Sequence, residues 1–479
     1  MPGDPTNVVF VLSDDQGPWA AGCYGNPEIR TPTIDRLAAE GLRFENFFCP
    51  SPVCSPSRAS YLTGTLPSQH GVHDWIRSGN VPPGERDREA TAEAPPAVPY
   101  LAEHTTYTEV LAAHGYECAL SGKWHLGDSA TPQAGFSRWF VHQSGGGPYY
   151  GAPVVRDGEF VREPRYITDA ITEEALGFLD AVAEPFYLGV HYTAPHAPWT
   201  ADGEAAGQHP GDLTESYDEC AFESCPQEPT HPWAIGLTEE TMGDREALKG
   251  YFAAVTAMDR GIGRIVDRLE ELGLREDTLI VVTSDNGFSC GHHGFWGKGN
   301  GTFPLNMYEN SVTVPFVASH PGRIPEGAVT GAMMSGYDLM PTLLEYLGLP
   351  VPDGDRPGRS YRPVWLGETD EARERVVVHG EYGNTRMLRT EDWKYVHRYP
   401  HGPHELYDLR ADPDERENLV EDPAHRERVD DLRADLADWF GRHVDPRLDG
   451  ARFPVTGRGQ HARIDADRPG ETVFEPREE

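Results

Sequence analysis

A cysteine and an arginine stand about one helical turn apart in the run Cys-Ser-Pro-Ser-Arg-Ala-Ser-Tyr-Leu-Thr-Gly, which extends from Cys54 to Gly64. The proline between them predicts that this run begins a helix. The N-terminus of a helix carries unpaired N–H groups and a partial positive charge, to which Arg58 adds a full charge. We therefore expect a site that lowers the pKa of the Cys54 thiol and binds an anion.

Polar side chains also follow four predicted strands, at the point where each strand ends. They are Asp14 and Asp15 after residues 8–12, Lys123 and His125 after 116–120, His191 and His196 after 185–190, and Asp285 and Asn286 after 278–282. In an open parallel sheet, ligands bind beyond the carboxyl ends of the strands. Packing alone does not explain residues able to bind a metal or an anion at all four ends, so the pattern predicts a single site at this edge.

The carboxylates of this set indicate a metal ion. Asp14 and Asp15, brought close to Asp285, would repel one another by several kcal/mol at the effective dielectric of a protein site. A divalent cation removes that repulsion, and the amide oxygen of Asn286 completes a set of oxygen donors. Such a set suits Ca²⁺ or Mg²⁺, whereas Zn²⁺ prefers cysteine and histidine ligands.

The run from Cys54 to Gly64 resembles the C-x-P-S-R-x-x-x-L-T-G signature of type I sulfatases, in the alkaline phosphatase superfamily, and matches every fixed position. In that family the cysteine is oxidised after translation to formylglycine, whose hydrated aldehyde is the nucleophile. The resemblance implies Ca²⁺, with Mg²⁺ or Mn²⁺ as alternatives. It also implies the metal ligands, which are Asp14, Asp15, Asp285, Asn286 and the formylglycine oxygen at position 54.

Three other segments resemble sulfatase motifs. Gly-Lys-Trp-His-Leu-Gly, which contains Lys123 and His125, is similar to a motif that contacts the aldehyde hydrate and the sulfate. His-Gly-Phe-Trp-Gly-Lys, which ends at Lys298, is similar to the segment with a sulfate-binding lysine. In His-Tyr-Thr-Ala-Pro-His-Ala-Pro, His196 fits the residue that faces the leaving-group oxygen better than His191 does. The resemblance makes His196 the general acid and His125 the base that restores the aldehyde.

The same resemblance implies the remaining roles. Asp285 and the metal activate one hydroxyl of the hydrated formylglycine derived from Cys54, and that hydroxyl attacks the sulfur in line with the departing alkoxide. Lys123 and Lys298 neutralise charge on the sulfuryl oxygens, which is electrostatic stabilisation. Arg58 orients the diol and its loop.

Two other hydrolytic activities remain open, and so does a protein without activity. Phosphonate monoesterases and phosphodiesterases of the superfamily can carry the same cysteine motif, but they typically have Asp-His-Gly where this chain has Asp285-Asn286-Gly287. The amide at position 286 therefore favours a carbohydrate or aryl sulfatase. A sulfamidase, which cleaves an N–S bond, is barely excluded by the motifs. A binding module without activity would not need intact cations and carboxylates in every motif.

The composition restricts the partners. The 479 residues carry 41 basic and 77 acidic side chains, a formal net charge of −36. This charge argues against nucleic acid and anionic membranes as partners, and it disfavours heavily sulfated polymers as substrates. A cationic pocket in an acidic shell can still bind a small sulfated molecule. Lysine is rare, and two of the four lysines, Lys123 and Lys298, fall inside the motifs.

The N-terminal region predicts a cytoplasmic protein. It has no basic segment followed by an apolar stretch of signal-peptide length, and an apolar strand begins at Val8. The seven cysteines show no disulfide framework. This location favours a small imported sulfate ester as substrate. The sulfatase resemblance implies a formylglycine-generating enzyme as the maturation partner. The oligomeric state stays open.

The elements that position these residues predict an α/β fold, in which a large, mostly parallel sheet is sandwiched by helices. Expected strands are 8–12, 116–120, 185–190, 278–282 and 314–317, and expected helices are 33–40, 106–114, 167–183, 245–272 and 338–347. We place the catalytic domain at residues 1–367. Residues 368–479 are expected to form a smaller antiparallel sheet with strands 375–379, 386–389, 393–397 and 405–408, a helix at 425–443 and a polar, mobile tail.

Irregular segments are expected around the pocket. Residues 78–99, 145–165 and 200–236 carry few periodic apolar residues and would determine specificity. The glycines at 145–147 are expected to form a wall of the site. Aromatic residues that could stack on a sugar or aryl ring are Trp75, Tyr149, Tyr150 and Trp199.

Overall fold

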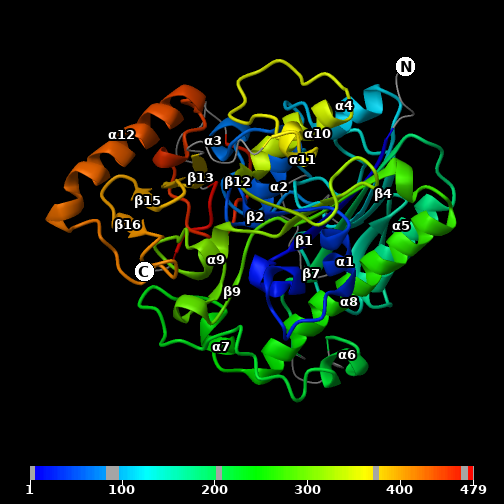
Figure 1. Cartoon of the computed structure of the whole chain (residues 1–479), viewed down its shortest axis with the longest axis horizontal. Helices are drawn as coiled ribbons and strands as arrows, with labels where there is room; N and C mark the ends of the chain where they lie inside the picture. The colour runs from blue at the N-terminus through cyan, green and yellow to red at the C-terminus, as the bar shows by residue number, and fades with distance from the viewer. Residues whose placement is uncertain (1–5, 82–96, 201–207, 370–376, 465–472, 478–479) are drawn as a thin grey trace.

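The computed structural model describes residues 6–81, 97–200, 208–369, 377–464 and 473–477 (Figure 1). Its centre is a ten-stranded sheet in the order β12-β2-β11-β8-β1-β7-β3-β4-β5-β6. In chain order these strands are β1 (Asn7–Asp14), β2 (Leu42–Phe48), β3 (Glu117–Gly122), β4 (Arg138–His142), β5 (Ala152–Arg156), β6 (Glu159–Glu163), β7 (Phe186–Pro195), β8 (Thr278–Ser284), β11 (Phe316–Ser319) and β12 (Ala328–Ser335).

Helices cover both faces of this sheet or lie in the connections beside it. They are α1 (Pro32–Ala39), α2 (Cys54–Thr63), α3 (Pro67–His70), α4 (Tyr107–Ala113), α5 (Ile167–Leu179), α6 (Gly211–Glu215), α7 (Thr238–Thr241), α8 (Arg245–Glu271), α9 (Glu309–Val312), α10 (Leu339–Tyr346) and α11 (Arg362–Trp365). A short hairpin, β9 (Ser289–Cys290) with β10 (Trp296–Gly297), lies beside them. The predicted α/β fold is confirmed.

Strand β1 explains why the sheet is covered on both sides. All eight of its residues are buried, and successive side chains point to opposite faces. Val8 and Phe10 pack in one core with residues of α2, α4 and α10, whereas Val9 and Val11 pack in a second core with α1, α5 and α8. Figure 1 shows α5 and α8 side by side on the second face. An uninterrupted apolar strand of this kind can only be central.

The parallel part of the sheet is its middle. Strands β8, β1, β7, β3 and β4 run parallel to one another, as predicted, and β12 runs parallel to β2. Strand β11 is antiparallel to both of its neighbours, and β5 and β6 form an antiparallel edge. The sequence analysis did not anticipate β2, β4, β5, β6 or β12. Several of these strands mix polar and apolar residues, so no continuous apolar run marks them.

A smaller unit begins with the strand that starts at Val378. Strands β13 (Val378–Tyr382), β14 (Thr385–Arg389), β15 (Trp393–Arg398) and β16 (Glu405–Asp408) form an antiparallel sheet, and α12 (Arg426–His443) follows them. Leu432, Leu436 and Phe440 of α12 pack against Leu388 and Tyr395 of that sheet. The predicted small sheet with one helix is confirmed. Residues 375–376 of the first predicted strand lie outside the described residues, and the domain boundary at 367 stays a prediction.

The C-terminal tail differs from expectation, because its described part is anchored rather than free. The buried side chain of Gln460 accepts from the backbone N–H of His73 at 2.8 Å and donates to the carbonyl of Gly71 at 3.0 Å. Its backbone pairs with Ile76 and with Phe474. Although the tail is polar, these hydrogen bonds hold it beside the segment that follows α3. Among the described helices, none has the length and apolar character needed to cross a bilayer.

Candidate active site

The four predicted strand ends meet in the structure. Asp14 is the last residue of β1, and Asp285 follows β8, which pairs with β1 in parallel. The backbone N–H of Asp15 lies 3.4 Å from Oδ1 of Asp285, so the two acidic turns are in contact. Lys123 follows β3, and its N–H donates to the carbonyl of His191 in β7 at 2.7 Å. The common edge of neighbouring parallel strands is the reason for this convergence.

A glycine permits the approach of β3 to β7. Gly122 has φ of +120°, and a Cβ built there would lie 1.9 Å from the carbonyl oxygen of His191. A side chain at this position would push Lys123 away from the site. Sequence reasoning identified the motif around Lys123, but this close backbone contact appears only in the tertiary structure.

Cys54 occupies the first position of α2, as predicted, and it is 3 % exposed. The next turn fixes the helix against β8. Ser57 donates to the carbonyl of Asp285 at 2.5 Å, and Arg58 Nε donates to Asp285 Oδ2 at 2.8 Å. Arg58 also donates to the carbonyl of Lys123 at 3.0 Å. The helix that carries the thiol is therefore tied directly to two of the strand ends.

The expected lowering of the Cys54 pKa is wrong. Burial raises the pKa of the thiol, and Asp14 adds to this, so the opposing charges of Lys123 and Lys298 do not prevail. The sequence shows the positive helix N-terminus, whereas complete desolvation is a property of the fold. The thiol at position 54 is therefore held neutral.

Two buried lysines pair with the two adjacent aspartates. Lys123 Nζ lies 2.5 Å from Asp14 Oδ2, and both side chains are fully buried. Lys298 Nζ pairs with Asp15 Oδ1 and lies 3.4 Å from Cys54 Sγ. Burial raises the pKa of Asp14, but the nearby cations, Lys123 foremost, outweigh it and hold the pKa well below its ordinary value. Both lysines that the sequence singled out thus lie in one cluster with the thiol.

The donor set fits a hard cation. Ligand atoms of Asp14, Cys54 and Asp285 lie within 4.8 Å of one another, and so do those of Asp14, Asp15 and His196. Asp14 Oδ1 and Asn286 Oδ1 are buried and have no hydrogen-bond partner among the described residues. Burial raises the pKa of Asp285 to about 6, and the Asp14 charge adds to this. Buried oxygens without partners and closely spaced carboxylates are what a divalent ion would stabilise.

The three candidate histidines differ in their exposure to solvent and in their hydrogen-bond partners. His125 Nε2 lies 2.9 Å from the carbonyl of Ile76, and its Nδ1 has no partner among the described residues. His196 has a side chain 30 % exposed, and its Nε2 lies 3.8 Å from Asp15 Oδ2. His191 is buried and faces the carbonyl of Lys123 at 3.2 Å. His196 is therefore the histidine accessible from solvent, in line with the choice made from sequence.

Burial keeps these imidazoles neutral. It lowers the pKa of His125 well below the ordinary value, and the Lys123 charge adds to this. It also lowers the pKa of His196, although Asp14 opposes the change. Backbone strain accompanies two site residues, since Asp15 and His125 have φ of 70° and 56°. Non-glycine residues in this left-handed region cluster at functional sites.

A cavity of about 450 Å³ opens onto this cluster. Asp15, His196 and Lys298 of the cluster are among its lining residues. The remaining lining residues are Ala197, Ile235, Gly236, Leu237, Phe288, Trp296, Gly297, Asn300, Gly301, Gly457, Arg458 and Arg477. Sequence reasoning missed Arg458 and Arg477, because no motif marks them and the tail was expected to be free. The only sequence feature that could have indicated them as binding residues is their positive charge in a strongly acidic chain.

The structure supports the predicted glycine wall of the site, but it places two of the four aromatic candidates in the core. A Cβ at Gly145 would lie 2.3 Å from the His125 ring, so this glycine does form a wall against a site residue. Tyr149 and Trp199 are buried core residues, and Tyr149 donates to the carbonyl of His196 at 2.9 Å. Tyr150 is 42 % exposed. Residues 82–96 and 201–207 of the expected specificity loops lie outside the described residues.

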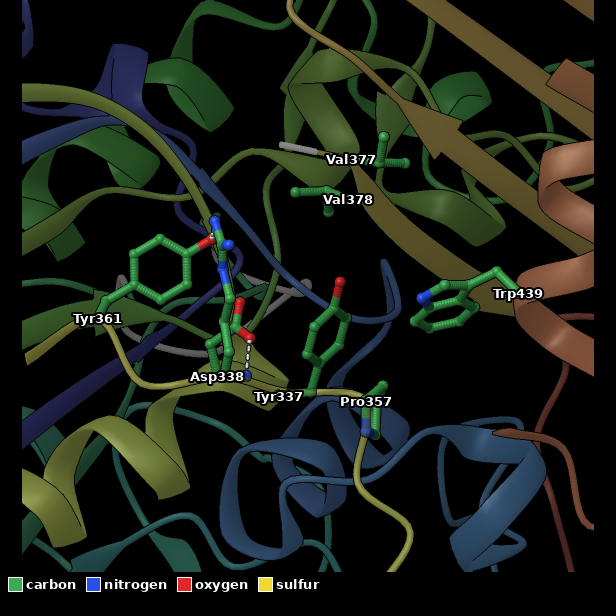
Figure 2. A pocket seen from close by; sticks show the side chains of 8 residues that line it. Tyr337, Asp338, Pro357, Tyr361, Val377, Val378 and Trp439 are labelled. Carbon is green, nitrogen blue, oxygen red and sulfur yellow. Dashed lines mark hydrogen bonds between the residues drawn. The ribbon is translucent and has the colours of Figure 1, made fainter. Parts of the chain in front are cut away.

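A second cavity, of about 200 Å³, lies between Trp439 of α12 and the segments around Tyr337, Arg359 and Val378, and contains none of the predicted site residues. Figure 2 shows Trp439 of α12 reaching toward it from one side, with Tyr361 and Asp338 on the other. Asp338 accepts from the backbone N–H groups of Ser335 and Arg359 at 2.8 and 2.9 Å. Its carboxylate is thus occupied in holding the chain, which indicates a structural role.

Comparison with known proteins agrees with this geometry. The family model described as Sulfatase matches residues 6–349, and that described as N-sulphoglucosamine sulphohydrolase, C-terminal, matches residues 291–440. The chain is 28% identical to an N-acetylglucosamine-6-O-sulfatase of Bacteroides thetaiotaomicron, over 86% of this chain and 82% of the relative. It is 30% identical to human arylsulfatase A, over 87% of this chain and 83% of that protein.

A solved structure also shares the fold. It is of a protein in complex with its substrate D-glucosamine-2-N,6-O-disulfate, and it matches with a TM-score of 0.74 and 26% identity, over 93% of this chain and 99% of that one. The cysteine motif, the strand-end cluster and these similarities agree. The chain belongs to the sulfatase family and is a sulfatase, a hydrolase of sulfuric esters.

Proposed function

We propose that this sulfatase cleaves the O–S bond of a small carbohydrate or aryl sulfate through a formylglycine made from Cys54. The observation that carries the proposal is the position of Cys54 Sγ, 3.4 Å from Lys298 Nζ and within the carboxylate cluster of Asp14 and Asp285. A formylglycine here would present two hydroxyls when hydrated, one to attack sulfur and one to let the product leave. The relatives named for N-acetylglucosamine 6-sulfate and aryl sulfates support this substrate class.

Cationic side chains would bind the sulfate. Lys123 and Lys298 each carry an ammonium group in the cluster, and burial makes their charges more effective than they would be in water. Arg58, which donates to Asp285, holds the nucleophile helix in register with β8. Its Nη2 has no partner among the described residues and is available to position the hydrated residue.

The proposed metal ligands are Asp14, Asp15, Asp285, Asn286 and the oxygen of residue 54, and Ca²⁺ is the ion we favour. When bound, the ion supplies positive charge that lowers the pKa of the nucleophilic hydroxyl and stabilises the sulfuryl oxygens. The chain prepares the site by keeping Asp14 ionised and by leaving Asp14 Oδ1 and Asn286 Oδ1 unoccupied by hydrogen bonds among the described residues.

Two histidines would transfer protons. His196 lines the cavity, so it can reach the leaving-group oxygen, and an arriving sulfate would favour its protonated form. His125 is buried and neutral, so its unpartnered Nδ1 can accept a proton from a hydroxyl in the site. This division assigns the general acid to the accessible histidine and the base to the buried one.

The decisive experiment compares kcat/KM for an aryl sulfate and for the matched aryl phosphonate monoester. The protein is co-expressed with a formylglycine-generating enzyme, and Cys54→Ala is the blank. We expect a strong preference for the sulfate that depends on Cys54. A preference for the phosphonate would reject the sulfatase assignment made from Asn286, and an equal rate in Cys54→Ala would reject the nucleophile. Measuring the location of the chain in cells tests the cytoplasmic prediction separately.

A further inference from the structure

We propose that the active-site cavity binds a second anionic group of the substrate, a carboxylate or another sulfate, through Arg458 and Arg477. This inference rests on the proposed function, because it extends the substrate from a simple sulfate ester to a small, doubly charged one. The two arginines belong to the C-terminal tail, which in Figure 1 is drawn in red between the small sheet and the main sheet.

Both arginines face the same cavity as the reacting groups. They line it together with Lys298, His196 and Asp15. The cavity volume, about 450 Å³, is that of a small-molecule site. A substrate whose sulfate reached Lys298 would therefore present the rest of its structure to the tail.

The tail is held firmly enough to form a binding surface. Gly457, which directly precedes Arg458 in sequence, accepts from Trp75 Nε1 at 3.2 Å and from Asn300 Nδ2 at 3.1 Å. Its φ of +75° is one that favours glycine. Arg477 Nε and Nη2 both donate to the carbonyl of Thr456, at 3.0 and 2.7 Å. The two arginine side chains thus project from an anchored segment.

The guanidinium groups keep donors for a ligand. Neither Arg458 nor Arg477 forms an ion pair within 4.0 Å among the residues that the structure describes. The Arg477 guanidinium lies 4.2 Å from the centre of the Phe303 ring and uses only Nε and Nη2 for Thr456. Burial lowers the pKa of Arg477, Tyr382 and Asp74 oppose the change, and the Arg458 charge adds to it, so the two cations lie close enough to repel.

Asp74 acts on Arg477 and Glu475 acts on Arg458, but neither carboxylate forms an ion pair with these arginines in the described part of the chain, which is unusual for two neighbouring cations in a chain with a net charge of −36. A carboxylate or sulfate would relieve their repulsion, and the guanidinium group matches either anion with two parallel hydrogen bonds. In the proposed function, the sulfate that is cleaved is bound by Lys123 and Lys298. The two arginines are therefore available to bind a different anionic group of the substrate. Apolar side chains of the cavity, such as Leu237 and Trp296, offer a surface for the ring between the two anions.

The test uses pairs of aryl sulfates that differ in one charge. 3-Carboxyphenyl sulfate is compared with its neutral analogue 3-carbamoylphenyl sulfate, and 3-sulfonatophenyl sulfate with 3-sulfamoylphenyl sulfate. We expect the charged member to have at least about tenfold higher kcat/KM in one or both pairs, the contribution of a charge-assisted hydrogen bond. Which pair responds identifies the carboxylate or the sulfonate as the preferred second group.

Variants assign the effect to the arginines. Arg458→Gln and Arg477→Gln should each reduce the preference about tenfold while leaving kcat/KM for the neutral analogue nearly unchanged. Arg452→Gln, an exposed arginine of the same tail, is the control and should retain the preference. Equal kcat/KM within both pairs in the unsubstituted protein, or an unchanged preference in both arginine variants, would overturn the inference.

A binding measurement separates this inference from the proposed function. Titration calorimetry with Cys54→Ala protein gives Kd for the same four compounds without any turnover. Tighter binding of a charged member, lost in the Arg458→Gln and Arg477→Gln variants, supports the second anion site even if no sulfate is hydrolysed. Equal Kd values for charged and neutral members would reject the site even in an active sulfatase.

Discussion

At the residue scale, the chemistry depends on a small cluster of charged side chains that is buried away from water. Cys54, Asp14 and Asp285 have ligand atoms within 4.8 Å of one another, and Lys123 and Lys298 neutralise part of the acidic charge. Because all are buried, each charge depends on its neighbours, and removing one changes the others. Three predictions belong at this scale.

Replacing Cys54 with serine should abolish turnover. In the proposed mechanism, a serine hydroxyl can attack sulfur, but it lacks the second hydroxyl through which formylglycine would release sulfate. We expect kcat to fall by at least about 10³-fold and a sulfated serine to accumulate. Intact-protein mass spectrometry after incubation with an aryl sulfate detects the adduct. Turnover near that of the unsubstituted protein would contradict the mechanism.

Lys123→Ala should lower kcat/KM by about 10²- to 10³-fold, as the loss of one preorganised charge in a buried site does. The change also leaves Asp14 without its partner at 2.5 Å. Lys249→Ala is the matched control, because Lys249 lies on α8 and pairs with Asp218 outside the cavity. Steady-state kinetics measure kcat/KM for both variants. An equal loss of kcat/KM in the two would show that removing any lysine has this effect, and would contradict a specific role of Lys123.

Ca²⁺ should stabilise the folded protein. An ion that binds only the native state adds about 2.7 kcal/mol when its concentration is 100 times Kd. Calorimetric Tm values with EDTA and with added Ca²⁺ measure the gain. Asn286→Ala should reduce it, since Asn286 Oδ1 is one of the free buried oxygens. A Tm unaffected by Ca²⁺ in the unsubstituted protein would reject Ca²⁺ as the ion.

At the element scale, the interface between the small sheet and α12 contains a buried titratable side chain. His379 of β13 stacks on Trp439 of α12 with ring centres 3.8 Å apart, and neither ring nitrogen has a hydrogen-bond partner in the described part of the chain. Burial lowers the pKa of His379 to about 3, and the positive charge of His443 adds to this. The neutral imidazole therefore belongs to the folded state.

This arrangement predicts a loss of stability in acid. The unfolded chain binds a proton at His379 below about pH 6.5, whereas the folded chain does not until about pH 3. As the pH decreases through that window, the free energy of unfolding should decrease by about 1.4 kcal/mol per pH unit because of this one group. His379→Phe keeps the stacking and should make the slope shallower by that amount. Urea unfolding between pH 7.5 and 5 measures it, with the exposed His114→Phe as control.

At the scale of the whole molecule, the excess of acidic residues governs the response to salt. A net charge of −36 gives the folded chain strong self-repulsion, which ions screen. We expect Tm to rise by a few degrees, roughly 2–5 °C, between low salt and about 0.5 M NaCl. Differential scanning calorimetry checks this. A falling Tm would mean that the specific ion pairs outweigh the overall repulsion.

Long continuous patterns were readable from the sequence. Residues 8–12 lie in a central strand because every one of them is apolar, and residues 245–271 form α8 because apolar residues repeat at helical spacing. The mixed strands β5 and β6 lack such a pattern and depend on pairing with β4 for their existence. The sequence therefore predicted the middle of the sheet better than its edge.

The sequence by itself determined the class of site. The residue types at the strand ends, the run from Cys54 to Gly64 and the two lysines in motifs required an acidic, cation-balanced cluster beside a cysteine. These features are local, because each depends on a residue and the strand or helix that precedes it. Their convergence follows from the general rule for parallel sheets.

Only the tertiary structure decided the electrostatics and the far wall of the cavity. The raised pKa of Cys54 depends on complete burial by distant segments, which no local pattern reports. Arg458 and Arg477 reach the cavity because the tail pairs with Ile76, far away in sequence. Contacts between segments that are remote along the chain set the desolvation and the cavity lining, and for that physical reason the sequence alone did not show them.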